Sequence, residues 1–182
     1  SCKTLKYWAE NNTGVRLLAI NLSARQLKDD PDWIDYMLEC LSSNSLEPSQ
    51  LVFELTETYL IEDFAACEQQ LIRLRSLGFK LLIDDFGVGY SSLGYLSKLP
   101  VDGVKLDRTL IADIESSLAM QSMVRNITRM SHDLNLKVVA EGVETAYQCE
   151  LIKKLGCDYI QGYYYSEPLE QDDFCNYLNH FN

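Results

Sequence analysis

The sequence predicts an α/β fold of the (β/α)8 TIM-like barrel type, with about six βα units in this chain of 182 residues. Two observations lead to this prediction. Short apolar runs alternate with segments of helical periodicity along the whole chain, which is typical of a parallel sheet with right-handed crossovers. Each apolar run is also followed by a polar residue suited to chemistry, as expected where the carboxyl ends of barrel strands converge.

Six short apolar or β-branched runs have the character of strands that are buried on both faces. They are RLLAI (Arg16–Ile20), LVFEL (Leu51–Leu55), KLLI (Lys80–Ile83), GVKL (Gly103–Leu106), KVVA (Lys137–Ala140) and DYI (Asp158–Ile160). Their alternation with helical segments along the chain predicts that they are parallel neighbours.

Between these runs, apolar residues recur at helical spacing. The segment TLKYWAENN is predicted to be a helix with no strand before it. Later helices are predicted after an Asp30 cap with Pro31 in the first turn, over the apolar series Phe64 to Leu74 ending near Gly78, over Met120 to Leu134, and over Tyr147 to Leu155 ending at Gly156.

Two architectures fit this pattern: an open doubly wound sheet and a barrel. A barrel brings all strand ends to one mouth, whereas an open sheet uses only those at its switch point. Because all six runs end near polar residues, the barrel explains more of the sequence. These residues are Asn21, Glu54 and Glu57, Asp84 and Asp85, Lys105 and Asp107, Glu141 and Glu144, and Gln161. Six strands do not close an eight-stranded barrel, so we expect residues 1–182 to form a single domain that lacks its first strands.

Composition narrows the classes of partner. The chain has 47% hydrophobic residues, 24% charged residues and a formal net charge of -11. Such a chain lacks the basic surface that polymeric nucleic acid or an anionic membrane requires. It also lacks an apolar run of transmembrane length and the core of a signal peptide. These features predict a cytoplasmic location, and any membrane tether of the parent protein would lie in segments absent from this chain.

The six cysteines show no CxxC pair, and we expect them to be reduced and mostly buried.

The adjacent carboxylates Asp84 and Asp85 need a partner of opposite charge. Two like charges about 4 Å apart repel by roughly 4 kcal/mol at the effective dielectric of a protein edge. One such residue could be an ordinary cap or turn former, but acids at four of the six strand ends favour divalent cations, which take oxygen ligands. Two such ions can drive in-line hydrolysis of a phosphate ester, and Lys105 would add the point charge that its transition state needs.

Five motifs carry a family resemblance. They are NLSARQL (Asn21–Leu27), FELTET (Phe53–Thr58), DDFGVGYSSLGYLSKLPVDGVKLDR (Asp84–Arg108), VVAEGVET (Val138–Thr145) and GCDYIQGYYYSEPL (Gly156–Leu169). In this order they resemble the EAL-domain family, bacterial cyclic di-GMP-specific phosphodiesterases. The resemblance implies hydrolysis of cyclic di-GMP to linear pGpG with two Mg²⁺ or Mn²⁺ ions.

The resemblance also implies roles for the residues at the strand ends. Asn21, Glu54 and Asp84 would bind one metal, and Asp84, Asp85 and Glu141 the second. Lys105 and Gln161 would contact the attacking water or the scissile phosphate, with Asp107 close to the substrate. Glu57 and Glu144 would brace the glycine-containing loop Phe86–Ser92, in which Val88 departs from the small or hydroxyl residue usual in the family.

A second departure is larger, because the Glu-Ala-Leu segment that names the family is absent from this chain. It would carry one ligand of the first metal. We therefore expect the chain alone to self-associate, as a homodimer or through its strand edges, or to be marginally stable, and to hydrolyse cyclic di-GMP at least about 10²-fold more slowly than a complete domain. The alternative is a non-catalytic EAL module that acts as a cyclic di-GMP receptor or protein-interaction domain. The parent chain is expected to carry upstream sensory or GGDEF domains.

Overall fold

The computed structural model describes residues 2–10, 14–15, 17–23, 26–27, 32–88 and 96–181. The chain divides into two compact units. The first contains residues 1–54, 65–81 and 168–182, and the second contains residues 55–64 and 82–167. Strands β2 and β3 and helix α4 each contribute residues to both units.

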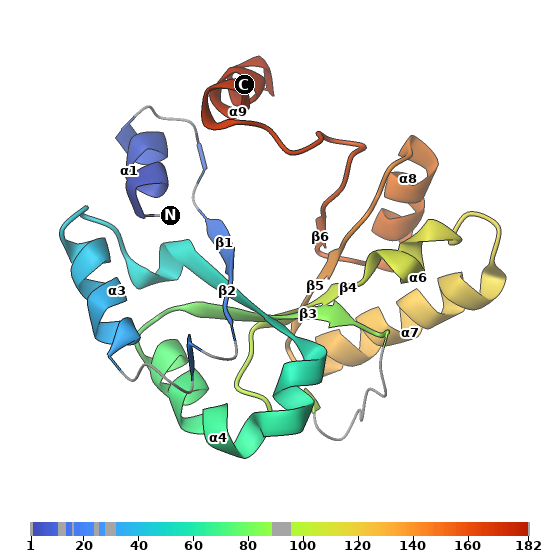
Figure 1. The fold of residues 1–182 in the computed structure, drawn as a ribbon. Helices are drawn as coiled ribbons and strands as arrows, with labels where there is room; N and C mark the ends of the chain where they lie inside the picture. Colours follow the sequence, from blue (N-terminus) through green and yellow to red (C-terminus); the bar gives the residue numbers. More distant parts are fainter. Residues whose placement is uncertain are drawn as a thin grey trace. The chain divides into compact units, whose positions relative to one another are not determined.

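The strands lie where the sequence predicts them. They are β1 (Leu18–Asn21), β2 (Leu51–Thr56), β3 (Lys80–Phe86), β4 (Gly103–Leu106), β5 (Lys137–Ala140) and β6 (Tyr159–Ile160). The strands follow one another in the sheet in chain order, from β1 to β6. β1 pairs with β2 in parallel, and β3, β4, β5 and β6 pair successively in parallel (Figure 1). The prediction of parallel βα units is therefore confirmed.

The first unit packs its helices around aromatic residues. It contains α1 (Cys2–Glu10), α3 (Trp33–Ser42), the short 3-10 helix η1 (Pro48–Gln50), most of α4 (Glu57–Ser76) and α9 (Gln171–Phe181). The Phe53 ring lies 5.5 Å from Trp33 edge-on and 5.2 Å from Phe79, measured between ring centroids. These buried rings, together with Ile34 and Leu41 on α3, form the apolar centre of this unit.

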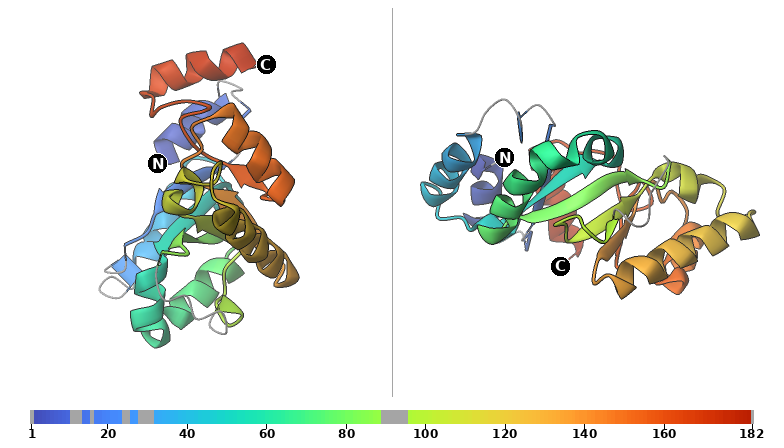
Figure 2. Two further views of the ribbon diagram at one scale, coloured as in Figure 1. Left: turned by 90° about the vertical axis from the view of Figure 1, so that its right-hand side faces the viewer. Right: turned by 90° about the horizontal axis from the view of Figure 1, so that it is seen from below.

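The second unit has helices that cover β4 and β5. It contains α6 (Arg108–Ala112), α7 (Leu118–Asp133) and α8 (Ala146–Leu155). α7 packs against β4 and β5 and contacts both α6 and α8, and Figure 2 gives two further views of these helices. Ser117 caps α7 by accepting a hydrogen bond from the Met120 N–H at 3.2 Å. α8 ends at Gly156, whose φ of 93° lies in the left-handed region that favours glycine, as predicted.

Some predicted boundaries are wrong. α3 has Asp32 in its N-cap position, so it begins two residues later than predicted, whereas Asp30 and Pro31 lie outside the described residues. α4 begins at Glu57, immediately after β2, and not near Phe64. The sequence analysis did not predict the short helices η1 and α6 or the C-terminal helix α9, because tertiary contacts stabilise short segments that have weak periodicity.

The cysteines of the described part are unpaired. Cys149 is buried, and Cys2, Cys40, Cys157 and Cys175 each expose only a minor part of their surface. The side chain of Cys67 lies outside the described residues. No helix in the described part of the chain is long and apolar enough to cross a membrane.

Candidate active site

The site in the second unit begins with a backbone irregularity at the end of β3. The pairing of β3 with β4 shifts register between Ile83 and Phe86. Within this shift Asp85 has a φ of 55°, a conformation that costs a non-glycine residue about 1 kcal/mol but that aspartate tolerates better than most. The Asp85 N–H donates to Asp84 Oδ1 at 3.1 Å. Asp85 therefore breaks the regular side-chain alternation of the strand at the point where the two carboxylates lie.

Lys105 on β4 is the buried cation of the site. Its side chain is only 5% exposed, and its Nζ lies 2.9 Å from Asp84 Oδ1 and 3.4 Å from Glu141 Oε2. Glu141 follows β5, which pairs with β4, and its N–H donates to the Leu106 carbonyl at 3.2 Å. Because an unpaired buried ammonium would be strongly destabilising, the two carboxylates stabilise Lys105 in its charged form. The register of three neighbouring strands thus brings one cation between two acids.

Asp85 shows how strongly negative charge is concentrated here. Burial raises the pKa of Asp85 above its usual value, the carboxylates of Asp84 and Asp107 raise it further, and Lys105 opposes them. Burial and the two neighbouring carboxylates together therefore outweigh the opposing effect of the Lys105 charge on the pKa of Asp85. An additional cation would stabilise the ionised form of Asp85.

Asp107 has a structural contact that the sequence analysis did not predict. Its Oδ1 accepts hydrogen bonds from the Thr109 N–H at 2.8 Å and from the Thr109 hydroxyl at 2.5 Å, so Asp107 is the N-cap of α6. The Asp107 N–H donates to the Phe86 carbonyl at 3.3 Å. These contacts fix Asp107 beside the end of β3, where its charge acts on Asp85.

Glu57 contacts the start of the glycine-containing loop. It is 7% exposed, and its Oε2 accepts a hydrogen bond from the Gly87 N–H at 3.2 Å. Gly87 has a φ of 100°, and a Cβ there would lie 2.8 Å from Leu110 Cδ1. The position therefore favours glycine both by conformation and by space. The rest of the predicted loop, from Gly89 onward, lies outside the described residues.

Gln161 and Glu144 lie at the ends of neighbouring elements. The Gln161 N–H donates to the Ala140 carbonyl at 2.8 Å, and the Gln161 carbonyl accepts from the Val143 N–H at 3.1 Å. These bonds fix the backbone of Gln161 directly beyond β6, and its side chain is exposed. The Glu144 N–H donates to Gln148 Oε1 at 2.7 Å as part of the cap of α8. The bracing of the loop Phe86–Ser92 by Glu144 stays a prediction, since most of that loop, from Gly89 to Ser92, lies outside the described residues.

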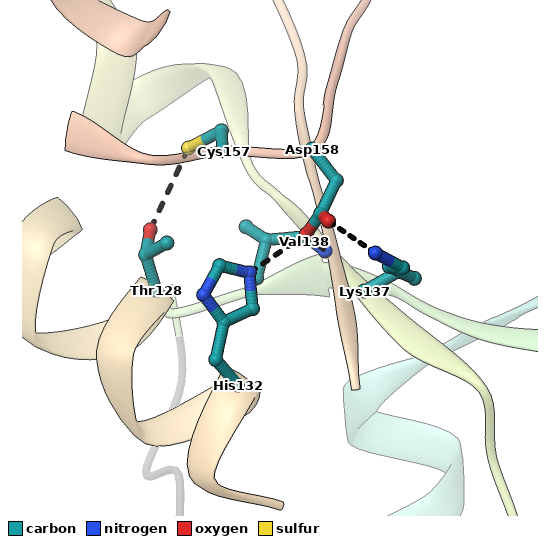
Figure 3. A network of polar contacts seen from close by, with 6 residues as sticks. All are labelled: Thr128, His132, Lys137, Val138, Cys157 and Asp158. Carbon is teal, nitrogen blue, oxygen red and sulfur yellow. Dashed lines mark hydrogen bonds and ion pairs between the residues drawn. The ribbon is translucent and has the colours of Figure 1, made fainter. Parts of the chain in front are cut away.

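A polar network at the opposite end of the strands holds β6 in place (Figure 3). The Asp158 carboxylate accepts hydrogen bonds from Lys137 Nζ at 2.6 Å and from the Val138 N–H at 2.9 Å, and its Oδ2 lies 2.8 Å from His132 Nε2. β6 consists of only two residues, and Asp158 and Gln161 flank it on either side. Because the strand is so short, the network that fixes Asp158 also helps to set where Gln161 lies. The sequence analysis missed this role, although an aspartate at the start of a largely apolar strand was a visible signal.

Asn21 and Glu54 belong to the first unit. They are register partners at the ends of β1 and β2, and the Leu22 N–H donates to the Glu54 carbonyl at 2.8 Å. Glu54 is partly exposed, and Asn21 is exposed. Two of the three residues predicted for the first metal, Asn21 and Glu54, are therefore adjacent on neighbouring strands.

The donor set is chemically suited to hard divalent cations. Asp84, Asp85 and Glu141 offer carboxylate oxygens, which Mg²⁺, Mn²⁺ and Ca²⁺ prefer. Among the described residues, however, no group of three acidic, histidine or cysteine side chains is arranged to hold a metal ion. Lys105 lies where it neutralises two of the acids. The residues therefore fit a metal in donor chemistry, and binding would require side chains to reorient.

The parallel strand order and the acidic site at the strand ends define a class of protein, the TIM-barrel-like α/β domains. A family model described as "EAL domain" matches residues 1–168, and the chain belongs to this family. The signaling protein YkoW of Bacillus subtilis is 35% identical over 178 residues, which are 98% of this chain and 22% of that protein. The bifunctional diguanylate cyclase/cyclic di-GMP phosphodiesterase MucR of Pseudomonas aeruginosa is 37% identical over 169 residues, which are 93% of this chain and 24% of that protein.

Solved structures agree with this assignment. The "PaMucR Phosphodiesterase, c-di-GMP complex" matches with a TM-score of 0.86 and 36% identity, over 95% of this chain and 70% of that one. The EAL domain of Mycobacterium smegmatis DcpA matches with a TM-score of 0.90 and 30% identity, over 98% and 80%. A manganese/cy-diGMP complex of Klebsiella pneumoniae BlrP1 matches with a TM-score of 0.85 and 35% identity, over 93% and 43%. The chain spans less than a quarter of the length of YkoW and MucR.

Proposed function

We propose that this chain is the phosphodiesterase part of a bacterial signalling protein and that it hydrolyses cyclic di-GMP to linear pGpG with the help of divalent cations. The observation that carries the proposal is the buried Lys105 ammonium, which lies between Asp84 and Glu141 at the carboxyl ends of adjacent parallel strands. Family membership and the cyclic di-GMP bound in the related PaMucR and BlrP1 structures support the choice of substrate.

The proposed metal ligands are Asn21 and Glu54 in the first unit and Asp84, Asp85 and Glu141 in the second. Bound divalent cations would lower the pKa of a water molecule and neutralise charge on the phosphate. The related BlrP1 complexes, one with manganese and one with calcium, support the choice of cation class.

The chain's own residues would act on the phosphate and the attacking water. Lys105 would hold a fixed positive charge near the scissile phosphate, where developing negative charge is stabilised by a preorganised cation. Gln161 would orient the water or the phosphate through its side-chain amide. Asp107 would remain close to the substrate while it caps α6. Glu57 would hold the start of the loop after Asp85 through the Gly87 N–H, and Glu144 would brace the same loop from the α8 side.

A second candidate is a module that binds cyclic di-GMP without hydrolysing it. The complexes of PaMucR and BlrP1 with cyclic di-GMP support this candidate as well, because each is a complex with the bound nucleotide. A homodimeric state and a cytoplasmic location stay predictions from the sequence.

Product formation decides between the two candidates. The purified chain would be incubated with cyclic di-GMP and Mn²⁺ or Mg²⁺, and pGpG would be measured by ion-exchange chromatography. We expect Asp84→Asn and Glu141→Gln to lower the rate at least about 10²-fold, and Lys105→Met to lower it about 10²-fold while leaving Mn²⁺ binding intact in calorimetry.

The matched control is Glu150→Gln on α8, an exposed glutamate 3.1 Å from Lys153 Nζ, which should leave the rate unchanged. Tight binding of cyclic di-GMP with no pGpG at saturating Mn²⁺ would support the receptor candidate instead. If Glu141→Gln retained more than a tenth of the unmodified rate, the assignment of this site would be wrong.

A further inference from the structure

Gln148 on α8 is a buried amide to which the proposed function gives no role. It is only 6% exposed, and its Oε1 accepts hydrogen bonds from the Glu144 N–H at 2.7 Å and the Thr145 N–H at 3.2 Å. Its Nε2 donates to the Ile111 carbonyl at 3.5 Å, a longer and weaker contact. A buried amide without partners would be destabilising, so these contacts fix the side chain. Gln148 thus joins the segment before α8 to α6.

Helix capping accounts for only part of these contacts. In a capping box, a glutamine at the third helical position accepts from the N–H of the N-cap residue, which here is Thr145. The Glu144 N–H lies outside this box, yet its bond to Gln148 is the shorter of the two. The contact with Ile111 also reaches a different helix. Gln148 therefore holds more of the chain than the start of its own helix.

The segment that Gln148 holds, residues 141–145, connects β5 with α8 and contacts two residues of the proposed site. It begins with Glu141, whose carboxylate pairs with the buried ammonium on β4. Its middle residue, Val143, donates its N–H to the Gln161 carbonyl at 3.1 Å. The position of this segment therefore sets how a proposed metal ligand and the residue proposed to orient the water lie relative to each other.

Close packing on both sides limits how this segment can move by itself. Gly142 has a φ of 75°, and a Cβ there would lie 2.5 Å from Arg108 Cβ, so the backbone lies directly against the first residue of α6. On the other side, a Cβ on Gly162 would overlap the carbonyl group of Val143. A shift of the segment would therefore displace the residues on both sides of it.

We propose that Gln148 is a positioning residue for the phosphodiesterase reaction, an inference that rests on the function proposed above. By accepting from Glu144 and Thr145, it fixes the segment that carries Glu141 and to which Gln161 is bonded. Gln148 would act through this backbone and not through contact with the phosphate. Small displacements matter here, because a misplacement of about 1 Å can cost about 10²-fold in rate, and the groups that support metal ligands contribute about 10- to 100-fold in metal affinity.

Gln148→Met tests this role, because it keeps the length of the side chain and removes both polar ends. We expect it to lower kcat for pGpG formation at least about tenfold and to weaken Mn²⁺ binding in calorimetry about tenfold. Gln148→Glu keeps the acceptor for the two N–H groups and should restore most of both. In the metal-free Gln148→Met variant, amide hydrogen exchange should be faster at Val143 and Tyr164, whose N–H groups join the segment to the chain around Gln161.

Ser117→Ala is the matched control, because it removes the N-cap of the neighbouring helix α7. It should lower Tm but leave kcat, Mn²⁺ affinity and exchange at Val143 unchanged when all variants are measured well below their Tm. If Gln148→Met does not fold, Gln148→Asn takes its place, since it keeps an amide but is one methylene shorter, and the same losses are expected.

Two results would overturn the proposal: equal effects of Gln148→Met and Ser117→Ala on Mn²⁺ affinity and on exchange at Val143, or a Gln148→Glu variant as impaired as Gln148→Met. Failure of the proposed function looks different, because the unmodified chain would then form no pGpG. The exchange rates of the metal-free chain would still decide whether Gln148 holds the segment.

Discussion

Asp158→Asn tests the network that fixes β6. Burial would by itself raise the pKa of Asp158, but hydrogen bonds from Lys137, His132 and the Val138 N–H lower it to about 2, from an ordinary value of 3.8. A shift of this size corresponds to about 2 kcal/mol of stabilisation of the ionised carboxylate. The asparagine side chain would keep the shape and could still accept from the Val138 N–H, but it would lose the negative charge that pairs with Lys137 and strengthens the contact with His132.

We therefore expect Asp158→Asn to lower the free energy of unfolding at pH 7 by about 2 kcal/mol. For a chain of this size that loss lowers Tm by about 4–8 °C. Urea denaturation followed by circular dichroism at 25 °C would measure the free energy of unfolding. Asp133→Asn, an exposed aspartate in the last turn of α7, is the matched control and should change it by less than about 0.5 kcal/mol.

The effect of Asp158→Asn on the free energy of unfolding depends on pH, and the direction of the Asp158 pKa shift determines how. Since the folded-state pKa of Asp158 is depressed, its stabilisation is fully present above the unfolded value of 3.8 and is lost as the pH falls through about 2. Lys137, whose pKa is raised by its hydrogen bond to Asp158, contributes stability below 10.5 that is lost only at higher pH. The difference in unfolding free energy between the unmodified chain and Asp158→Asn should be constant from about pH 5 to 10 and fall to a small fraction of its value by about pH 2. A difference that persists undiminished at pH 2, or none at pH 7, would refute the reasoning.

Three further predictions concern single contacts. Gly162→Ala should destabilise the chain by at least about 2 kcal/mol in thermal unfolding, because a Cβ there would lie 2.1 Å from the Val143 carbonyl oxygen, and an unchanged Tm would contradict this. Thr145→Ala should cost about 1 kcal/mol by removing the N-cap of α8, whereas Thr145→Ser should restore most of it. Glu57→Gln, which weakens the acceptor for the Gly87 N–H, should weaken one of two Mn²⁺ binding events about tenfold in calorimetry; equal weakening of both would reject this role.

Much of the fold could be predicted from the sequence because its signals are local. The run KVVA predicts β5, and the structure places that strand at Lys137–Ala140. Gly156 marks the end of α8 because few other residues adopt its left-handed conformation. The boundaries that failed lie where periodicity is weak, as at the start of α4, which follows β2 without a turn. The hydrogen bond from Gly87 to Glu57 matches the contact predicted for Glu57, since glycine at a loop start and an acid beyond a strand are both visible in the sequence.

The sequence by itself determined the order of the strands, the polar residues at their ends and the family to which the chain belongs. Only the tertiary structure decided which of these residues contact one another. The pairing of Lys105 with both Asp84 and Glu141, the left-handed backbone of Asp85 and the position of Cys2 against Met37 depend on register and helix packing. Such contacts join positions that are distant in sequence, and their distances arise from the packing of whole elements. A local pattern of apolar and polar residues carries no measure of those distances.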